Sequence, residues 1–432
     1  MTSPTAPASA ASPLGRSTTP DPRQAVTYYR DVKASSDGAG SVAAPAARRA
    51  NPAQVLEAIR SVVQGEASLH APEFAGNERA YVLDTIDSGW VSSVGSYVDR
   101  FESLVAEICG VGSAVAAVNG TAALHIALLL GGVRPGDEVL TPSLTFIATA
   151  NAVTYCGATP HFVDASEETL GVDPVALDAH LREVGHRGPN GLVNRRTGRP
   201  IRALLPMHTF GHPADVDALV DVCERQGLVL VEDAAESIGS TYKGKPMGGF
   251  GRIGAVSFNG NKTVTTGGGG AVVTNDPDLG RRAKHLTTQA KVPHRWEYVH
   301  DEIGFNYRLP NINAALGCAQ LEQLDRFVEE KRRLANRYLD AFDGLDGVRA
   351  FREPSFARSN YWLNAMVLDE PDVTLRDEIL EITNDAGLMT RPVWRLMHRL
   401  PMYAEHPRME LPVAESLEAR LINMPSSAVL GR

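Results

Sequence analysis

Lys262 is the residue of this sequence with the clearest capacity for covalent chemistry. It follows an apolar run and lies among Asn and Gly residues in SFNGNKTVTTGGGG, residues 257–270, which ends in four consecutive glycines. A lysine in a dry site can lose its proton and form a Schiff base, and glycines let a bound ring approach the backbone closely. Taken alone, the pattern is also typical of a surface lysine in a flexible loop.

A second segment, LVLVEDAAESIG at 228–239, carries three carboxylates: Glu232, Asp233 and Glu236. Carboxylates at the C-terminal end of a strand lie where open α/β sheets bind ligands, and burying an unpaired Asp is costly. We therefore expect a buried cationic partner for Asp233. The protonated pyridine nitrogen of a cofactor is one such partner.

A third segment, VNGTAALHIALLL at 118–130, places a turn of small residues before an apolar helix. The N–H groups at a helix start favour anions, so Gly120, Thr121 and Ala122 can hold a phosphate. The alternative is a simple helix cap.

Two further segments have open interpretations. In TPSLTFIATANAV, Phe146 follows a strand and can stack on a planar ring, although a core phenylalanine is the simpler reading. In GFNYRLPNINAALG, Asn306 and Arg308 can reach a phosphate or carboxylate, in the same chain or across a subunit boundary, or can belong to a well-capped loop.

Short, β-branched strands alternating with helices must position these residues, and this alternation predicts an α/β fold with a largely parallel sheet. Helices are expected to begin near Gly120, Thr145, Asp173 and Pro213, and a long amphipathic helix is expected over 311–342. The predicted strands lie at 114–118, 138–142, 159–164, 201–207, 228–233, 254–259 and 270–276, and the last two form a tighter pair around Lys262.

Three regions follow from composition. Residues 1–50 are rich in Ala, Ser, Thr, Pro and Gly and predict a disordered tail. Residues 51–310 are expected to form a large cofactor-binding domain, and residues 311–432 a smaller C-terminal domain.

Composition also bounds the function. The formal charge of −9 is modest, and no basic patch or long apolar run points to a nucleic-acid or membrane partner. The four cysteines are far apart and are expected to be reduced core thiols, with no metal site. The N-terminal segment lacks the apolar centre of a secretory signal, so the cytoplasm is the expected location.

The five segments together, in this order, resemble the DegT/DnrJ/EryC1/StrS family of pyridoxal 5′-phosphate (PLP) dependent sugar aminotransferases. The similarity covers roughly residues 89–342. It implies PLP fold type I, similar to aspartate aminotransferase, with a large, mostly parallel α/β domain and a smaller C-terminal α/β domain. SSVGSYVDRFE and SFNGNKTVTTGGGG look most like the branch that aminates position 4 of UDP- or GDP-linked 4-keto-6-deoxy sugars, the type found in bacillosamine and legionaminic acid pathways.

The resemblance also implies residue roles. By motif position Lys262 matches the Schiff-base lysine, and Asp233 matches the partner of the pyridine nitrogen. Glu236 matches the residue near the phenolic oxygen, where many members have Gln, and Asn259 stands where many have His. The remaining matches are Phe146 with the ring-stacking aromatic, Thr121, Ala122 and Ser257 with phosphate ligands, and Asn306 with the asparagine that reaches the phosphate of the neighbouring subunit.

The implied reaction transfers the amino group of L-glutamate to a nucleotide-linked keto sugar in a homodimer with composite sites. Two alternatives are a PLP-dependent sugar dehydratase and a non-catalytic PLP- or sugar-binding regulator. Dehydratases of this fold resemble the chain but have histidine at the Lys262 position, and the complete Lys262 and Asp233 pair argues against a degenerate site.

Overall fold

The computed structural model describes residues 49–189 and 191–432. The predicted disordered tail lies outside these residues except for its last two, of which Ala50 is buried. The first helix, α1 (Pro52–Val62), begins at Asn51, whose side chain accepts a hydrogen bond from the Ala53 N–H at 2.9 Å. In the described part of the chain, no helix has both the length and the apolarity needed to cross a membrane.

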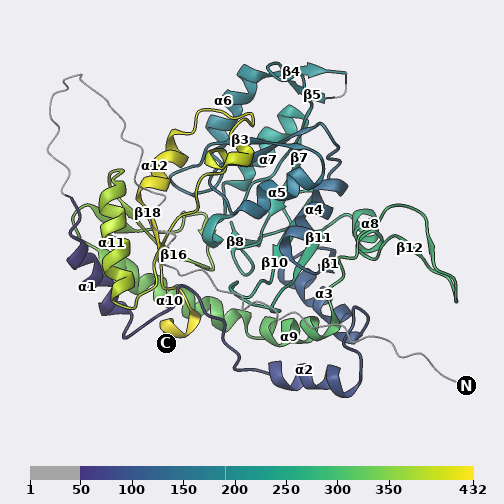
Figure 1. Ribbon diagram of the computed structural model, residues 1–432, viewed down its shortest axis with the longest axis horizontal. Helices are drawn as coiled ribbons and strands as arrows, with labels where there is room; N and C mark the ends of the chain where they lie inside the picture. The colour runs from purple at the N-terminus through teal and green to yellow at the C-terminus, as the bar shows by residue number, and fades with distance from the viewer. Residues whose placement is uncertain (1–48, 190) are drawn as a thin grey trace, which may run out of the picture. The chain divides into compact units, whose positions relative to one another are not determined.

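A seven-stranded sheet forms the centre of the molecule, in the order β1-β11-β10-β7-β6-β2-β3 (Figure 1). Neighbours from β10 to β3 run parallel, whereas β11 pairs antiparallel with both β1 and β10. Its strands are β1 (Ser113–Ala117), β2 (Glu138–Pro142), β3 (Thr159–Val163), β6 (Ile201–Leu204), β7 (Val229–Asp233), β10 (Ile253–Ser257) and β11 (Gly270–Thr274). The α/β prediction and the tighter pair of strands beside Lys262 are confirmed.

Helices cover both faces of this sheet, because successive strand residues point to opposite sides. In β1, Val115 packs in the core on the face of α4, while Ala114 and Ala116 pack in the core beneath α3 and α9. Helices α2 (Glu78–Asp87) and α3 (Ser96–Ile108) precede the first strand. The helices that follow strands of this sheet are α4 (Gly120–Leu130), α5 (Ile147–Tyr155), α6 (Pro174–Val184), α7 (Val216–Gln226) and α8 (Pro277–Thr287). Three small sheets also form: β4 (Gly185–Gly188) with β5 (Gly191–Asn194), β8 (Thr241–Tyr242) with β9 (Lys245–Pro246) and β15 (Ala357–Arg358), and β12 (Lys291–Val292) with β13 (Val299–His300).

The predicted single helix over 311–342 is wrong in one respect, because the structure has two helices there. They are α9 (Asn311–Leu321) and α10 (Leu324–Phe342), separated at Glu322 and Gln323. The Gln323 amide nitrogen lies 2.6 Å from Glu78 Oε1, and Glu322 accepts a hydrogen bond from Asn77 at 2.8 Å. The break separates α9, which is mostly buried and packs against α2 and α3, from the amphipathic α10.

A second, antiparallel sheet follows, in the order β14-β16-β18-β17. Its strands are β14 (Val348–Ala350), β16 (Asn364–Leu368), β17 (Arg391–Pro392) and β18 (Leu421–Met424), accompanied by α11 (Val373–Asp385) and α12 (Pro412–Arg420). Helix α1 packs against α10 and α11 beside this sheet, whereas α9 packs against the helices of the first sheet. Helix α1, from the predicted large domain, thus packs beside the second sheet, and α9, from the predicted small domain, packs with helices of the first. The division into 51–310 and 311–432 stays a prediction.

Candidate active site

A cavity of about 280 Å³ opens at the C-terminal ends of β1, β2, β7 and β10. This is the edge at which open α/β sheets bind ligands. Among the residues that line it are eight of the ten predicted site residues: Gly120, Thr121, Phe146, Asp233, Glu236, Ser257, Asn259 and Lys262. Ala122 and Asn306 are not among them.

Lys262 follows β10 in a turn closed by its own N–H, which donates to the Asn259 carbonyl at 3.0 Å. Its side chain is only 12% exposed, and Nζ lies 3.1 Å from Glu236 Oε1. Nζ also lies 3.6 Å from the centre of the Trp362 ring. The amine is therefore nearly buried and is held between a carboxylate and an aromatic face.

Asp233 is the last residue of β7 and is 2% exposed. The Thr149 hydroxyl donates to Oδ2 at 2.8 Å and the Ala235 N–H donates to Oδ1 at 3.2 Å. Burial raises the pKa of this carboxyl above its ordinary value, although the two hydrogen bonds oppose the rise. A cation bound beside Asp233 would favour the charged carboxylate and offset its burial.

Glu236 lies on the turn after β7. Burial raises the pKa of this carboxyl to about 7, against the opposing charge of Lys262. The Phe210 N–H donates to its other oxygen at 2.8 Å. Phe210 has a left-handed backbone, with φ of 56°, which is uncommon for a residue with a bulky side chain. The carboxyl is thus fixed from two sides.

The first turn of α4 contacts β10 and β11 closely because two glycines leave room. A Cβ on Gly120 would lie 2.8 Å from the Cβ of Ser257, and a Cβ on Gly270 would lie 2.6 Å from the Asn119 carbonyl group. The N–H groups of Gly120 and Thr121 have no acceptor within the helix, as in any first turn. The Ala122 N–H instead donates to the Asn119 side chain at 2.8 Å.

Comparison with known proteins identifies the family. The sequence profile of the DegT/DnrJ/EryC1/StrS aminotransferase family matches residues 72–432. The chain belongs to this family. The GDP-perosamine synthase of Caulobacter vibrioides is 41% identical over 366 residues, which cover 84% of this chain and 94% of that enzyme. The GDP-perosamine synthase of Escherichia coli O157:H7 is 40% identical over 358 residues, covering 83% and 92%.

Solved structures of aminotransferases share the fold. DesV of S. venezuelae superposes with a TM-score of 0.73 at 31% identity, covering 90% of this chain and 95% of that one. The aminotransferase TlmJ of Streptoalloteichus hindustanus gives 0.75 at 29% identity, covering 84% and 94%. The expected type I fold of PLP enzymes is confirmed, and the chain is a PLP-dependent sugar aminotransferase of the DegT/DnrJ/EryC1/StrS family.

The residues of the cavity fit PLP chemically. Lys262 is a nearly buried amine that can condense with an aldehyde. Asp233 is a buried acid without an ion-pair partner among the described residues, and a protonated pyridine nitrogen would supply one. A helix start beside the Ser257 hydroxyl suits a phosphate. Which residue performs each of these roles in this aminotransferase remains a prediction.

Several lining residues had no signal in the sequence. Thr149 lies in the first turn of α5 and reaches Asp233, while Trp362 and Trp394 come from the region of the second sheet. Phe146 precedes α5 and is 49% exposed, with its ring edge-on to Trp394 at 6.2 Å.

Asn306 and Arg308 lie elsewhere in the chain. Asn306 is exposed, and its backbone forms an isolated antiparallel β-bridge with Thr288, which follows α8. Arg308 lines a separate cavity of about 210 Å³, and its Nε is buried without a hydrogen-bond partner among the described residues. Neither side chain reaches the Lys262 cavity of its own chain.

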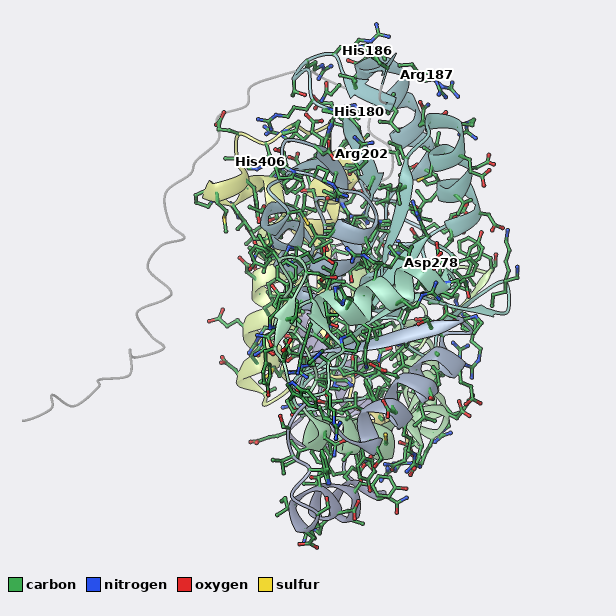
Figure 2. All side chains as sticks on the ribbon, turned by 90° about the vertical axis from the view of Figure 1, so that its right-hand side faces the viewer. His180, His186, Arg187, Arg202, Asp278 and His406 are labelled. Atoms are coloured by element: carbon green, nitrogen blue, oxygen red, sulfur yellow. The ribbon has the colours of Figure 1, made fainter. Side chains whose placement is uncertain are left out.

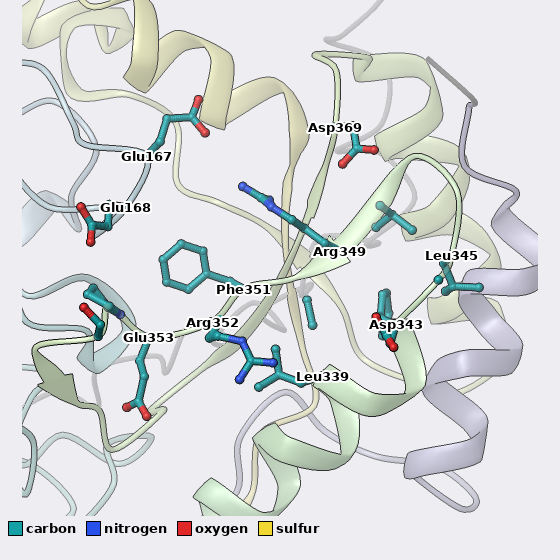
Figure 3. Close-up of a pocket in the computed structure, with 16 residues that line it drawn as sticks. Glu167, Glu168, Leu339, Asp343, Leu345, Arg349, Phe351, Arg352, Glu353 and Asp369 are labelled. Atoms are coloured by element: carbon teal, nitrogen blue, oxygen red, sulfur yellow. The ribbon is translucent and has the colours of Figure 1, made fainter. Parts of the chain in front are cut away.

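Two further features of the described residues lie away from this site. A cavity of about 610 Å³ beside β14 is lined by charges of both signs, including Arg349 and Glu168, and contains no lysine (Figure 3). His180, near one end of the molecule in Figure 2, has its Nε2 2.8 Å from His161 Nε2, and His161 bonds the buried Glu138 at 2.8 Å. That network joins α6 to β2 and β3.

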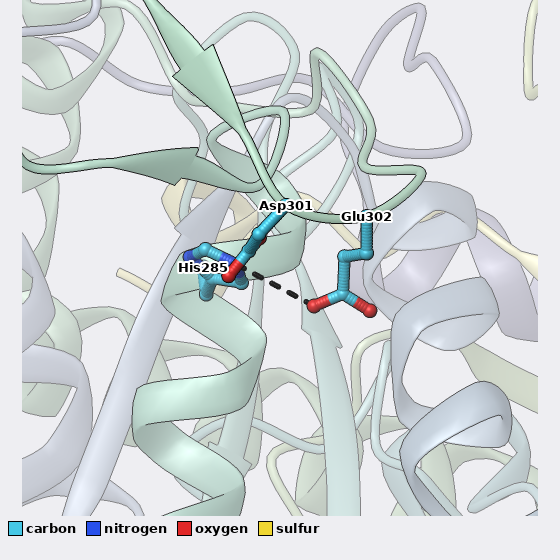
Figure 4. A group of neighbouring side chains, drawn as sticks. All are labelled: His285, Asp301 and Glu302. Atoms are coloured by element: carbon cyan, nitrogen blue, oxygen red, sulfur yellow. Dashed lines mark hydrogen bonds and ion pairs between the residues drawn. The ribbon is translucent and has the colours of Figure 1, made fainter.

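A third cluster lies at the base of the β12–β13 hairpin. His285 Nε2 is 2.7 Å from Asp301 Oδ1 and 3.4 Å from Glu302 Oε1 (Figure 4). Arg282 on the same helix already pairs with Glu302. These contacts anchor the hairpin to α8.

Proposed function

We propose that this aminotransferase moves the amino group of L-glutamate onto the keto carbon of a nucleotide-linked 4-keto-6-deoxy hexose. The observation that carries the proposal is the buried Lys262 amine in one cavity with the buried Asp233 carboxyl. Three GDP-perosamine synthases among the relatives, at 37 to 41% identity, favour a GDP-linked sugar over a UDP-linked one.

The proposed roles follow from position and environment. Bound PLP supplies an aldehyde that condenses with amines and a ring that stabilises negative charge on an adjoining carbon. Lys262 Nζ holds the aldehyde at rest and, once free, moves the proton taken from the Cα of the amino donor. Asp233 holds the proton on the ring nitrogen, and Glu236 accepts hydrogen bonds from Lys262 and the Phe210 N–H.

Phosphate binding is assigned to Gly120, Thr121 and Ser257 at the start of α4. Ala122 would join them only if its N–H left the Asn119 side chain. Phe146 stacks on the ring in this proposal, and Asn259 contacts the cofactor from the turn after β10. We further propose a cytoplasmic homodimer in which Asn306 reaches the partner's cofactor phosphate.

Two features support the dimer. Asn306 is exposed, and the neighbouring hairpin presents large apolar side chains to solvent, namely Trp296, Tyr298, Val299 and Ile303. Figure 1 shows this hairpin extending beyond α8, away from the sheet. Exposed apolar surface of this extent typically marks an interaction site.

Product analysis tests the substrate. Purified enzyme with PLP and glutamate would be offered GDP-, UDP- and dTDP-linked 3-keto and 4-keto sugars, with HPLC of the nucleotide sugars and assay of 2-oxoglutarate. We expect one amino sugar per 2-oxoglutarate, formed fastest from a GDP-linked 4-keto sugar. Turnover confined to 3-keto sugars, or loss of water without 2-oxoglutarate, would overturn the proposal.

Borohydride reduction tests the lysine. Reduced PLP should be found on the peptide that contains Lys262, should be absent from Lys262→Ala, and should be retained in the surface control Lys245→Ala. An adduct on another lysine would contradict the assignment of the site.

A further inference from the structure

Trp362 contacts Lys262 although it lies a hundred residues further along the chain. The Lys262 Nζ stands 3.6 Å from the centre of the Trp362 ring, well inside the distance at which an ammonium is attracted to an aromatic face. The tryptophan is 4% exposed and lines the same cavity. Among the described residues, the ring and the Glu236 carboxyl contact this amine.

The indole is held firmly in place. Its Nε1 donates to the Asn261 carbonyl at 2.7 Å, next to Lys262 in the chain. Its backbone N–H donates to Asn360 Oδ1 at 2.7 Å, and its carbonyl accepts from the buried Lys331 Nζ at 3.1 Å. Two of these bonds fix the backbone of Trp362 and one fixes its ring, so the indole face is preorganised and needs little further ordering.

Asn360 also fixes the turn that carries Glu236, the other residue in contact with the Lys262 amine. Its side-chain amide donates to the Glu236 carbonyl at 2.9 Å and to the Ile238 carbonyl at 2.8 Å. One asparagine therefore joins the turn that carries Glu236 to the backbone of Trp362. The relative position of the carboxyl and the indole is set by this link.

The two contacts respond differently to pH. Burial raises the pKa of Glu236 to about 7, so that this carboxyl is partly protonated near neutral pH and is then a weaker partner for an ammonium. The face of an indole does not titrate. The Lys262 side chain is only 12% exposed, so without the indole face its ammonium would lose favourable hydration free energy without replacement.

We propose that Trp362 is a positioning residue that receives the Lys262 ammonium once this lysine, released from the cofactor, has taken up a proton. The ring holds the ammonium in place until that proton is delivered. This inference rests on the proposed role of Lys262 as the cofactor lysine.

Fluorinated tryptophan tests the proposal without a change of shape. Fluorine withdraws charge from the ring face, so the ammonium should be less favoured and the neutral amine, which alone reacts with acylating reagents, more abundant. In cofactor-free protein at one mildly alkaline pH, we expect Lys262 to be acylated about two- to threefold faster after difluorotryptophan incorporation. Peptide mass spectrometry measures the rate at Lys262.

Matched variants isolate the ring responsible, because the chain has four tryptophans. The fluorine effect should disappear in Trp362→Phe and persist in Trp394→Phe, which removes the other tryptophan of the cavity. An unchanged rate in fluorinated wild-type protein, or an effect that survives in Trp362→Phe, would overturn the inference. Borohydride trapping tests the cofactor lysine separately, so failure of that role and failure of the Trp362 contact give different results.

Discussion

Three carboxylates on the β7 segment show how residue environment separates chemical roles. Glu232, Asp233 and Glu236 are all buried, yet their surroundings differ. Burial raises the pKa of Glu232, but His208 and the N–H groups of Gly248 and Gly251 outweigh it, so that its pKa falls below the ordinary value. Asp233 and Glu236 have fewer donors, and burial prevails at both. Glu232 is therefore a structural carboxylate, while the other two face the cavity.

A test of Asp233 follows at this scale. Asp233→Asn keeps the size of the side chain and the Thr149 hydroxyl has an oxygen to bond, so the protein should fold and retain cofactor. Transamination should fall by orders of magnitude, because an amide cannot keep the ring nitrogen protonated. Single-turnover kinetics with glutamate would measure the loss. Near-normal turnover would refute the role.

Glu236 gives a prediction for pH and stability. Its pKa is near 7 in the folded protein against an ordinary value of 4.5, so between these values the folded state binds the proton more tightly than the unfolded state. Its contribution to stability is present below about pH 4.5 and is lost as pH rises towards 7. Cofactor-free Glu236→Gln should therefore lose less stability than wild type between these two pH values. Urea unfolding at both pH values would measure the free energy of unfolding of each protein. An equal loss of stability in wild type and variant would exclude the effect.

At the scale of elements, the site depends on the close contact of the α4 start with the strand pair β10–β11. Gly270 is the key position, since an added Cβ would meet the backbone of Asn119 and Gly120 at 2.6 and 2.7 Å. Backbone atoms cannot rotate away as a side chain can. The helix start would have to shift, and with it the proposed phosphate site.

Gly270→Ala should accordingly destabilise the protein by about 1 to 3 kcal/mol and weaken PLP binding. Gly268→Ala is the matched control in the same glycine run, because the nearest atom to its added Cβ is 4.0 Å away. Thermal unfolding and titration with PLP would compare the two. Equal behaviour of both variants would contradict the role of this contact.

At the scale of the whole molecule, the exposed position of Asn306 raises the question of which chain's site it serves. If each site combines Lys262 of one subunit with Asn306 of the partner, both single variants are impaired as homodimers. A heterodimer of Lys262→Ala and Asn306→Ala would then have both defects in one site and an intact second site.

Subunit exchange between the two inactive variants should restore up to about half of the wild-type activity per heterodimer. Native mass spectrometry would verify the exchange, and the rate of 2-oxoglutarate formation would report recovery. Verified exchange with no recovery, from two folded parents, would show that both residues serve the same chain's site.

Local pattern alone determined much of this protein. Short apolar runs separated by turns placed the strands of the central sheet to within a few residues, since burial on both faces requires such runs. The same pattern put Asp233, Glu236 and Lys262 just beyond strand ends, and parallel strands bring those ends to one edge. The family and its cofactor followed from the order of the motifs.

Only the tertiary structure decided what those residues touch. The contact of Lys262 with Trp362, the bond from Thr149 to Asp233 and the strained Phe210 that holds Glu236 join segments far apart in the chain. The break between α9 and α10 likewise arose from Glu78 and Asn77 on another helix. Such contacts depend on how whole elements pack, and the periodicity of a single segment carries no information about residues that are far away in the sequence.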